Sequence, residues 1–201
     1  MTLTLALEYA GTFFLAISGI RMAAAHKLDP FGMLVIGFIT ATGGGTLRDI
    51  LIDTKVFWMD KPIYTGIIIA AFFFTLIFRK FVVHLRYTFY IFDTLGIGLF
   101  TIIGIEKSLS MGYSPMIASF MGVITSVVGG MTRDILLNEV PLILRKEIYA
   151  TACLLGCGVY FGLSYFNISQ AIIDISTFAT IVLVRTLAIK FKVSFPTINV
   201  T

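Results

Sequence analysis

Two short stretches of the sequence place charged residues beside glycines inside apolar runs. The first, GGGTLRDI, covers residues 43–50, and the second, VGGMTRDI, covers residues 128–135. Each contains an arginine followed directly by an aspartate, namely Arg48 with Asp49 and Arg133 with Asp134. Ionised side chains inside a membrane-spanning segment are costly and normally face a partner or water. The two stretches are therefore the first candidates for a functional site.

The glycines suggest one chemistry for these stretches. A glycine in a helix costs roughly 1 kcal/mol relative to alanine, and irregular backbone inside a membrane survives only where protein buries it or water lines it. We therefore expect broken helices at Gly43, Gly44 and Gly45 and at Gly129 and Gly130, with free carbonyl oxygens that bind a monovalent cation. Hydroxyls would add to such a path, from Thr40, Thr42, Thr125 and Ser126. The alternative is that the glycines let two helices pack closely.

The Arg-Asp pairs also allow two interpretations. Neighbouring helical residues point about 100° apart, so each arginine is not expected to pair well with its own aspartate. We expect a swap instead, with Arg48 bound to Asp134 and Arg133 bound to Asp49. The alternative is that each arginine extends to the lipid headgroups from a helix end.

Further charged residues lie at matched or isolated positions in the apolar runs. Glu8 and Asp93 are either acids at a pore mouth or wetted acids at helix N-termini. Lys61 with Tyr64 and Lys146 with Tyr149 are expected to be interface anchors, with a gating role as the alternative. Arg185 is expected to reach the cytoplasmic headgroups, with gating or lipid binding as the alternative.

The elements that carry these residues are membrane-spanning helices. The 201 residues are 58% hydrophobic and 13% charged, whereas a soluble domain carries roughly 25% charged residues. Most of the apolar runs approach the roughly 20 residues that a spanning helix needs. We therefore predict an all-α integral membrane protein with seven transmembrane helices, at Leu3–Ala25, Phe31–Ile52, Ile63–Phe78, Tyr90–Ile105, Pro115–Leu137, Ile148–Phe166 and Ala171–Ile189.

A shift of 85 residues aligns the first three spans with the next three without a gap. The aligned positions include the glycines, the Arg-Asp pairs and the prolines at 30 and 115. We predict one domain over residues 1–201, with repeat 1 at about 3–81, repeat 2 at about 88–166 and a seventh helix at about 170–190. Because each repeat contains three spans, an odd number, the second repeat enters the membrane from the opposite side, as in many proteins that move solutes.

The basic residues predict the orientation. Eight lie on one side of the predicted membrane, including Arg86 and Lys192, and three lie on the other, Lys55, Lys61 and Lys107. Positive charge collects on the cytoplasmic side, so we predict a cytoplasmic C-terminus and an external N-terminus. The basic residues form no patch with stacking aromatics, so no nucleic-acid partner is expected. No nucleophile and base arrangement, phosphate loop or dinucleotide motif is visible, so neither an enzyme nor a cofactor is expected.

The two glycine motifs and the 3+3+1 arrangement resemble the trimeric intracellular cation (TRIC) channels, and in particular their prokaryotic members. The family's domain is also labelled a glycine-transporter domain. The resemblance implies a homotrimer with a potassium-permeable pore in each protomer, lined by the glycine-kinked second and fifth helices. Animal members carry a longer basic tail and bind phosphoinositide, whereas this chain stops soon after Lys192. The resemblance therefore implies a prokaryotic plasma membrane, with membrane lipid and further copies of the chain as the expected partners.

Two functions remain open from the sequence. The first is a channel for monovalent cations such as potassium or sodium. The second is a carrier for a small solute such as glycine, in which Arg48 or Arg133 binds the carboxylate of the solute.

Overall fold

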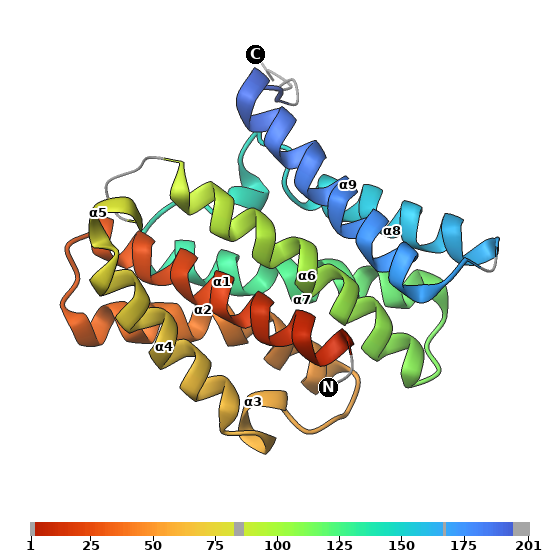
Figure 1. The fold of residues 1–201 in the computed structure, drawn as a ribbon, viewed down its shortest axis with the longest axis horizontal. Coiled ribbons are helices and arrows are strands. Elements are labelled where there is room, and N and C mark those ends of the chain that lie inside the picture. The colour runs from red at the N-terminus through yellow and green to blue at the C-terminus, as the bar shows by residue number, and fades with distance from the viewer. Residues whose placement is uncertain (1–2, 83–86, 167, 195–201) are drawn as a thin grey trace, which may run out of the picture.

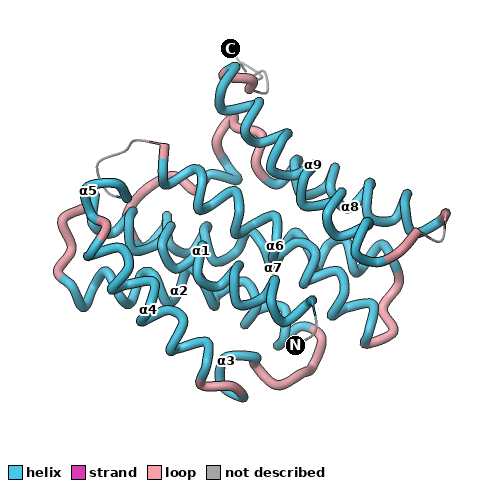
Figure 2. The backbone as a smooth tube through the Cα atoms, in the orientation of Figure 1, coloured by secondary structure: helices cyan, strands magenta, loops and turns pink. Residues whose placement is uncertain are grey.

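The computed structural model describes residues 3–82, 87–166 and 168–194. Arg86, one of the basic residues used for the orientation, lies outside them. Within the described residues the chain is helical, as Figure 2 shows. The helices are α1 (Leu3–Ala25), α2 (Pro30–Leu51), α3 (Phe57–Asp60), α4 (Ile63–Ile77), α5 (Arg79–Val82), α6 (Thr88–Ser110), α7 (Pro115–Leu136), the 3-10 helix η1 (Leu142–Leu144), α8 (Ala150–Tyr165) and α9 (Gln170–Phe191).

The N-termini of α2 and α7 are set by the same local chemistry. The Asp29 carboxylate accepts a hydrogen bond from the backbone N–H of Gly32 at 2.7 Å. The Ser114 hydroxyl accepts one from the N–H of Ile117 at 3.5 Å. A proline follows each cap at the first helical position, where its missing N–H costs nothing and its fixed φ suits the helix. The sequence therefore fixes where both helices begin.

Four helices form the centre of the molecule. α1 packs against α2, α2 against α7, α7 against α6, and α6 against α1, so that they close a ring. α4 lies against α1 and α2 on one side, and α8 and α9 lie together on the other side, as Figure 1 shows. The buried apolar side chains between them form the core, including Leu15, Ile17, Ile20, Ile97 and Phe100.

The prediction of an all-helical membrane protein is confirmed. Each predicted apolar run contains a helix. Among the described residues, five helices are long and apolar enough to cross a membrane, namely α1, α2, α6, α7 and α9. Two further apolar helices, α4 and α8, are shorter, with 15 and 16 residues.

The glycine motifs do not interrupt their helices. α2 is α-helical from Pro30 to Leu51 and α7 from Pro115 to Leu136, without a gap at Gly43–Gly45 or at Gly129 and Gly130. The expected unwound segments are therefore wrong, and so is the expected cation site on free glycine carbonyls. The reason is that carbonyls within a continuous helix already accept hydrogen bonds from the following turn.

Candidate functional site

The glycines make the contact between α2 and α7. A Cβ atom on Gly44 would overlap the backbone carbonyl of Thr125, and one on Gly129 would overlap the carbonyl of Thr40. A Cβ on Gly43 would come within 3.3 Å of the Gly129 Cα atom. The missing side chains therefore let the two backbones touch, which is the close packing that small residues permit in membrane helices.

The arginine of each motif binds the aspartate that follows it. Arg48 Nε lies 2.8 Å from Asp49 Oδ1, and Arg133 Nε lies 2.8 Å from Asp134 Oδ1. The expected swap between the repeats is therefore wrong, because the long arginine side chain folds back to its neighbour despite the angle between them. All four side chains are buried, so the alternative of arginines at the headgroups is also wrong.

The second oxygen of each aspartate explains this local pairing. Asp49 Oδ2 accepts a hydrogen bond from the backbone N–H of Phe57 at 2.9 Å. Asp134 Oδ2 accepts one from the N–H of Leu142 at 3.0 Å. Each carboxylate thus ties the loop after its helix back to the helix end, and the adjacent arginine balances its charge.

Around the second motif, Asp93 of α6 joins two arginines. Its Oδ1 lies 3.0 Å from Arg133 Nη1, and its Oδ2 lies 3.0 Å from Arg185 Nη1 of α9. The Ser18 hydroxyl of α1 accepts from Arg133 Nη1 at 2.9 Å. Arg185 also stacks on the Tyr149 ring, at 4.4 Å from the ring centroid. These side chains, which we call the Asp93 cluster together with Asp134, are all buried.

Around the first motif the arrangement is different and more open. Lys107 Nζ at the end of α6 lies 2.7 Å from Asp49 Oδ1, with the lysine side chain 28% exposed. Glu8, which aligns with Asp93, accepts a hydrogen bond from the Tyr64 hydroxyl at 2.5 Å. We call Arg48, Asp49 and Lys107 the Asp49 cluster.

Several sequence-based expectations for single residues need correction. Asp93 and Arg185 are buried against each other, so Asp93 lies neither at a pore mouth nor at a wetted helix N-terminus, and Arg185 does not reach the headgroups. Tyr64 and Tyr149 are buried and do not anchor the protein at an interface, because their rings pack inside the bundle. The lysines expected to act with them, Lys61 and Lys146, are exposed.

The hydroxyls expected along the path are buried and donate hydrogen bonds to their own helices. Thr40 and Thr42 donate to the carbonyls four residues earlier, both at 2.7 Å. Thr125 donates to the carbonyl of Met121 in the same way, and Ser126 donates to the carbonyl of Val123 at 2.9 Å. Each hydroxyl has thus used its one hydrogen, so its oxygen can still accept a hydrogen bond but cannot donate another.

Two hollows lie at opposite ends of α6 and α9. The Glu8 hollow, of about 510 Å³, is lined by the start of α1, the end of α6 and the start of α9, and it contains Glu8, Glu106, Lys107 and Gln170. The Glu147 hollow, of about 460 Å³, is lined by the start of α6, the end of α9 and the segment before α8. Asp93 and Arg185 lie about one helical turn from residues that line the second hollow, Tyr90 and Ala188.

Some N–H groups of the arginines lack an acceptor. Among the described residues, no hydrogen-bond partner is found for Arg185 Nε and Nη2 or for Arg48 Nη1. Buried polar groups of this kind are normally satisfied by protein or by ordered water. The interior therefore offers polar groups that water or a polar solute can use.

Several residues of the site carry no sequence signal that assigns them to it. Lys107 has the sequence context of a loop cation, and Ser18 is a small residue within an apolar run. The backbone donors of Phe57 and Leu142 have one signal, because these positions are 85 residues apart and so are matched by the repeat.

This fold and site define a multi-pass helical membrane protein with a buried ionic interior. The family model described as "Glycine transporter" matches residues 5–80 and again residues 90–165. The chain therefore belongs to this family. The two matched segments begin 85 residues apart, which is the shift that aligns the glycine motifs.

Relatives and solved structures agree with this assignment. The inner membrane protein YadS of Escherichia coli (strain K12), a UPF0126 protein, is 38% identical over 95% of this chain and 94% of its own length. A UPF0126 membrane protein of Vibrio cholerae is 36% identical over 97% of this chain and 82% of its own length. A solved TRIC channel orthologue from Rhodobacter sphaeroides is similar with a TM-score of 0.89 and 34% identity, covering 96% of this chain and all of that one. A second TRIC cation channel structure has a TM-score of 0.87 and 31% identity, covering 100% of this chain and 99% of that one.

Proposed function

We propose that this protein is a passive channel for monovalent cations. The observation that carries the proposal is the similarity to solved TRIC cation channels over nearly the whole chain, at 34% identity and a TM-score of 0.89. The interior is consistent with such a role, because buried ionic side chains lie between two hollows that open at opposite ends of the bundle. No catalytic role is proposed for any residue.

We further infer that seven helices cross the membrane as two inverted repeats and one extra helix. Two contacts between helix ends support the opposite orientation of the two repeats in the membrane. His26, after α1, lies 3.3 Å from Glu139, after α7, and Lys107 at the end of α6 contacts Asp49 at the end of α2. α1 and α7 thus end on one side, and α2 and α6 on the other, as inversion requires. The excess of lysine and arginine beyond α1, α7 and α9 supports a cytoplasmic C-terminus.

The proposed ion path runs between the Glu8 hollow and the Glu147 hollow, alongside the contact of α2 with α7. The Glu8 hollow contains two carboxylates and one lysine, a composition that attracts cations. The Asp93 cluster lies near the other end and is fully buried. We infer that this cluster closes the path in the present conformation and that water or ions reach it only after a rearrangement.

We propose that the functional unit is a homotrimer with one path in each chain, and that potassium is the main permeant ion. The support is the similarity to the Rhodobacter sphaeroides protein, which is reported as a trimeric cation channel. A third similar structure, at 28% identity and a TM-score of 0.85, is reported for a prokaryotic TRIC channel in 0.5 M KCl. Because no long fixed filter is present in the described residues, we expect weak discrimination between potassium and sodium.

Planar bilayers test the proposal directly. Purified protein is added to a bilayer in symmetric KCl, and we expect discrete unitary currents. Under a KCl gradient and without applied potential, we expect a net positive current from the concentrated to the dilute side, because potassium crosses more easily than chloride. Repeated failure to see unitary currents from correctly folded protein would overturn the proposal.

A carrier for a small carboxylate solute is the second candidate. The description of the family as glycine transporters favours it, and Arg48 Nη1 is a buried donor without an acceptor among the described residues. Proteoliposomes loaded with buffer distinguish the two functions. Saturable uptake of labelled glycine without unitary currents would establish the carrier, whereas currents without uptake would establish the channel.

A further inference from the structure

The chain turns back sharply after α9. The helix ends at Lys192, whose φ of 52° and ψ of 37° lie in the left-handed region. The backbone N–H of Val193 then donates a hydrogen bond to the carbonyl of Ala188 at 2.9 Å, which closes the turn. The next residue, Ser194, forms an antiparallel bridge with Glu147 in the segment before α8. We call Lys192, Val193 and Ser194 the strap.

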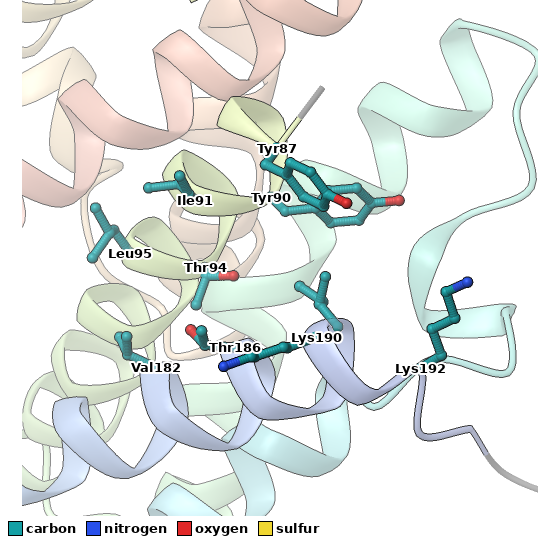
Figure 3. Close-up of a pocket in the computed structure, with 10 residues that line it drawn as sticks. Tyr87, Tyr90, Ile91, Thr94, Leu95, Val182, Thr186, Lys190 and Lys192 are labelled. Carbon is teal, nitrogen blue, oxygen red and sulfur yellow. The ribbon is translucent and has the colours of Figure 1, made fainter. Parts of the chain in front are cut away.

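The strap lies over the Glu147 hollow. All three of its residues line the hollow, together with Tyr87 and Tyr90. Figure 3 shows these two tyrosines at the start of α6, near the end of α9 that carries Lys192. Val193 is 49% exposed, so the strap has the hollow on one side and the outside of the bundle on the other.

The strap is held weakly. Its bridge to Glu147 is isolated, without further strand pairing among the described residues. Lys192 occupies a backbone conformation that costs roughly 1–2 kcal/mol for a residue other than glycine. Glu147 Oε2 is shielded from solvent and has no hydrogen-bond partner among the described residues. Because an unpaired buried oxygen has lost its bonds to water, the closed strap is opposed by its own backbone and by the carboxylate beside it.

The device is present at one end of the molecule only. α9 has no counterpart in the repeat, and neither does the strap that follows it. Every residue that lines the Glu8 hollow at the other end belongs to a helix. The two mouths of the proposed ion path therefore differ, and a movable segment lines only the one that contains Glu147.

We infer that the strap is a gate at the Glu147 end of the ion path. When the turn at Lys192 opens, Val193 and Ser194 leave the hollow and water reaches the Glu147 carboxylate. This carboxylate then attracts cations to the open mouth. The inference rests on the proposed channel function, and it makes the strap and the Asp93 cluster two barriers in series along one path.

Labelling of a cysteine inside the hollow tests the movement without measuring conduction. Ala188 lines the hollow and is 6% exposed, so Ala188→Cys places a thiol behind the strap with a small change in volume. The full chain, with Cys153→Ala and Cys157→Ala, is placed in lipid nanodiscs. The rate of reaction with a cationic methanethiosulfonate then reports how often the strap opens.

Val193→Pro, added to this labelling background, should free the strap. Proline lacks the N–H that closes the turn, and the loss of one hydrogen bond predicts labelling about tenfold faster. Val193→Ala is the matched control, because it shortens the side chain but keeps the N–H. Thermal unfolding of both variants checks that they are folded.

Lys192→Gly should act in the opposite direction. Glycine adopts the left-handed conformation without strain, so the closed strap becomes more stable and labelling should slow about fivefold or more. Lys192→Gln is the reference for this variant, because both substitutions remove the same charge and only glycine relieves the backbone.

Single-channel currents then connect the strap with conduction. Val193→Pro should raise the open probability above that of Val193→Ala in symmetric KCl. Equal labelling rates in these two variants would overturn the strap. Faster labelling of the proline variant with unchanged currents would overturn its role as a gate. Faster labelling in a protein that shows no current in any variant would confirm that the strap moves and would overturn the channel function instead.

Discussion

Arg185 and Asp93 form a fully buried ion pair, with Nη1 of the arginine 3.0 Å from Oδ2 of the aspartate. Arg185 belongs to α9, which has no counterpart in the repeat, and Asp93 belongs to the first helix of the second repeat. The pair therefore attaches the extra helix to the interior of the bundle. No such contact is available to Glu8, which occupies the matching position in the first repeat and bonds to Tyr64 instead.

Asp93→Asn should destabilise the protein strongly. The change leaves Arg133 and Arg185 without their shared carboxylate, and breaking a buried pair in this way costs about 3–5 kcal/mol. Thermal unfolding in detergent measures the effect. Asp53→Asn is the matched control, because Asp53 is exposed and its positive φ of 53° is tolerated by asparagine. Equal unfolding temperatures for the two variants would contradict the structural role of Asp93.

Lys107→Gln should change conduction more than stability. The lysine is 28% exposed and pairs with Asp49. In the variant, Asp49 keeps Arg48 and the backbone N–H of Phe57 as partners. A partly exposed ion pair contributes up to about 1 kcal/mol to the stability of the fold. Its removal leaves the Glu8 hollow more negative. We expect the potassium conductance to rise by a factor of about two or more in ~0.01 M KCl, where charges act over about 30 Å.

Single-channel recording of this variant beside Lys61→Gln provides the comparison. Lys61 is exposed and does not line the hollow, so its loss should leave the low-salt conductance nearly unchanged. If both variants conduct like the unchanged protein, the Glu8 hollow is not part of the path.

Gly44→Ala and Gly129→Ala should separate α2 from α7. In each case the new methyl group overlaps a backbone carbonyl of the facing helix, which cannot move as a side chain can. Overpacking of this kind costs about 1–3 kcal/mol. Gly158→Ala and Gly162→Ala are the controls, since a Cβ at either position meets nothing within 4 Å. Thermal unfolding in detergent should give lower unfolding temperatures for the first two variants than for the controls. Higher unfolding temperatures for the first two would contradict the close contact between α2 and α7.

Labelling of introduced cysteines tests the inverted arrangement. Lys61 and Lys146 are aligned by the repeat and exposed, and inversion places them on opposite sides of the membrane. In a Cys153→Ala, Cys157→Ala background, Lys61→Cys should react with an impermeant maleimide in intact cells. Lys146→Cys should react only after the cells are opened. Reaction of both from the same side would rule out inversion.

The sequence predicts the helices well because their signals are local. Apolar runs give the positions of the helices, and Asp29 with Pro30 and Ser114 with Pro115 are sufficient to begin α2 and α7. The repeat shift of 85 residues also relates two backbone contacts of the folded protein. Asp49 and Asp134 each accept a hydrogen bond from the backbone N–H of the residue eight positions later.

The partners of the charged residues could not be predicted because they depend on contacts between distant helices. Arg185 has no repeat counterpart, so no pattern in the sequence connects it with Asp93. Gly44 illustrates the same limit: a glycine cluster fits either a broken helix or a close crossing, and only the position of Thr125 on the facing helix decides between them.

The Asp93 cluster contains two arginines and two aspartates, and with all four ionised it carries no net charge. Moving one elementary charge across the membrane is worth about 2.3 kcal/mol per 100 mV, but a balanced group that moves as a unit gains nothing from this electrical work. The Asp49 cluster has two cations against one carboxylate, and its lysine is partly exposed. Displacement of the Asp49 cluster across the membrane would therefore involve electrical work, whereas displacement of the intact Asp93 cluster would not.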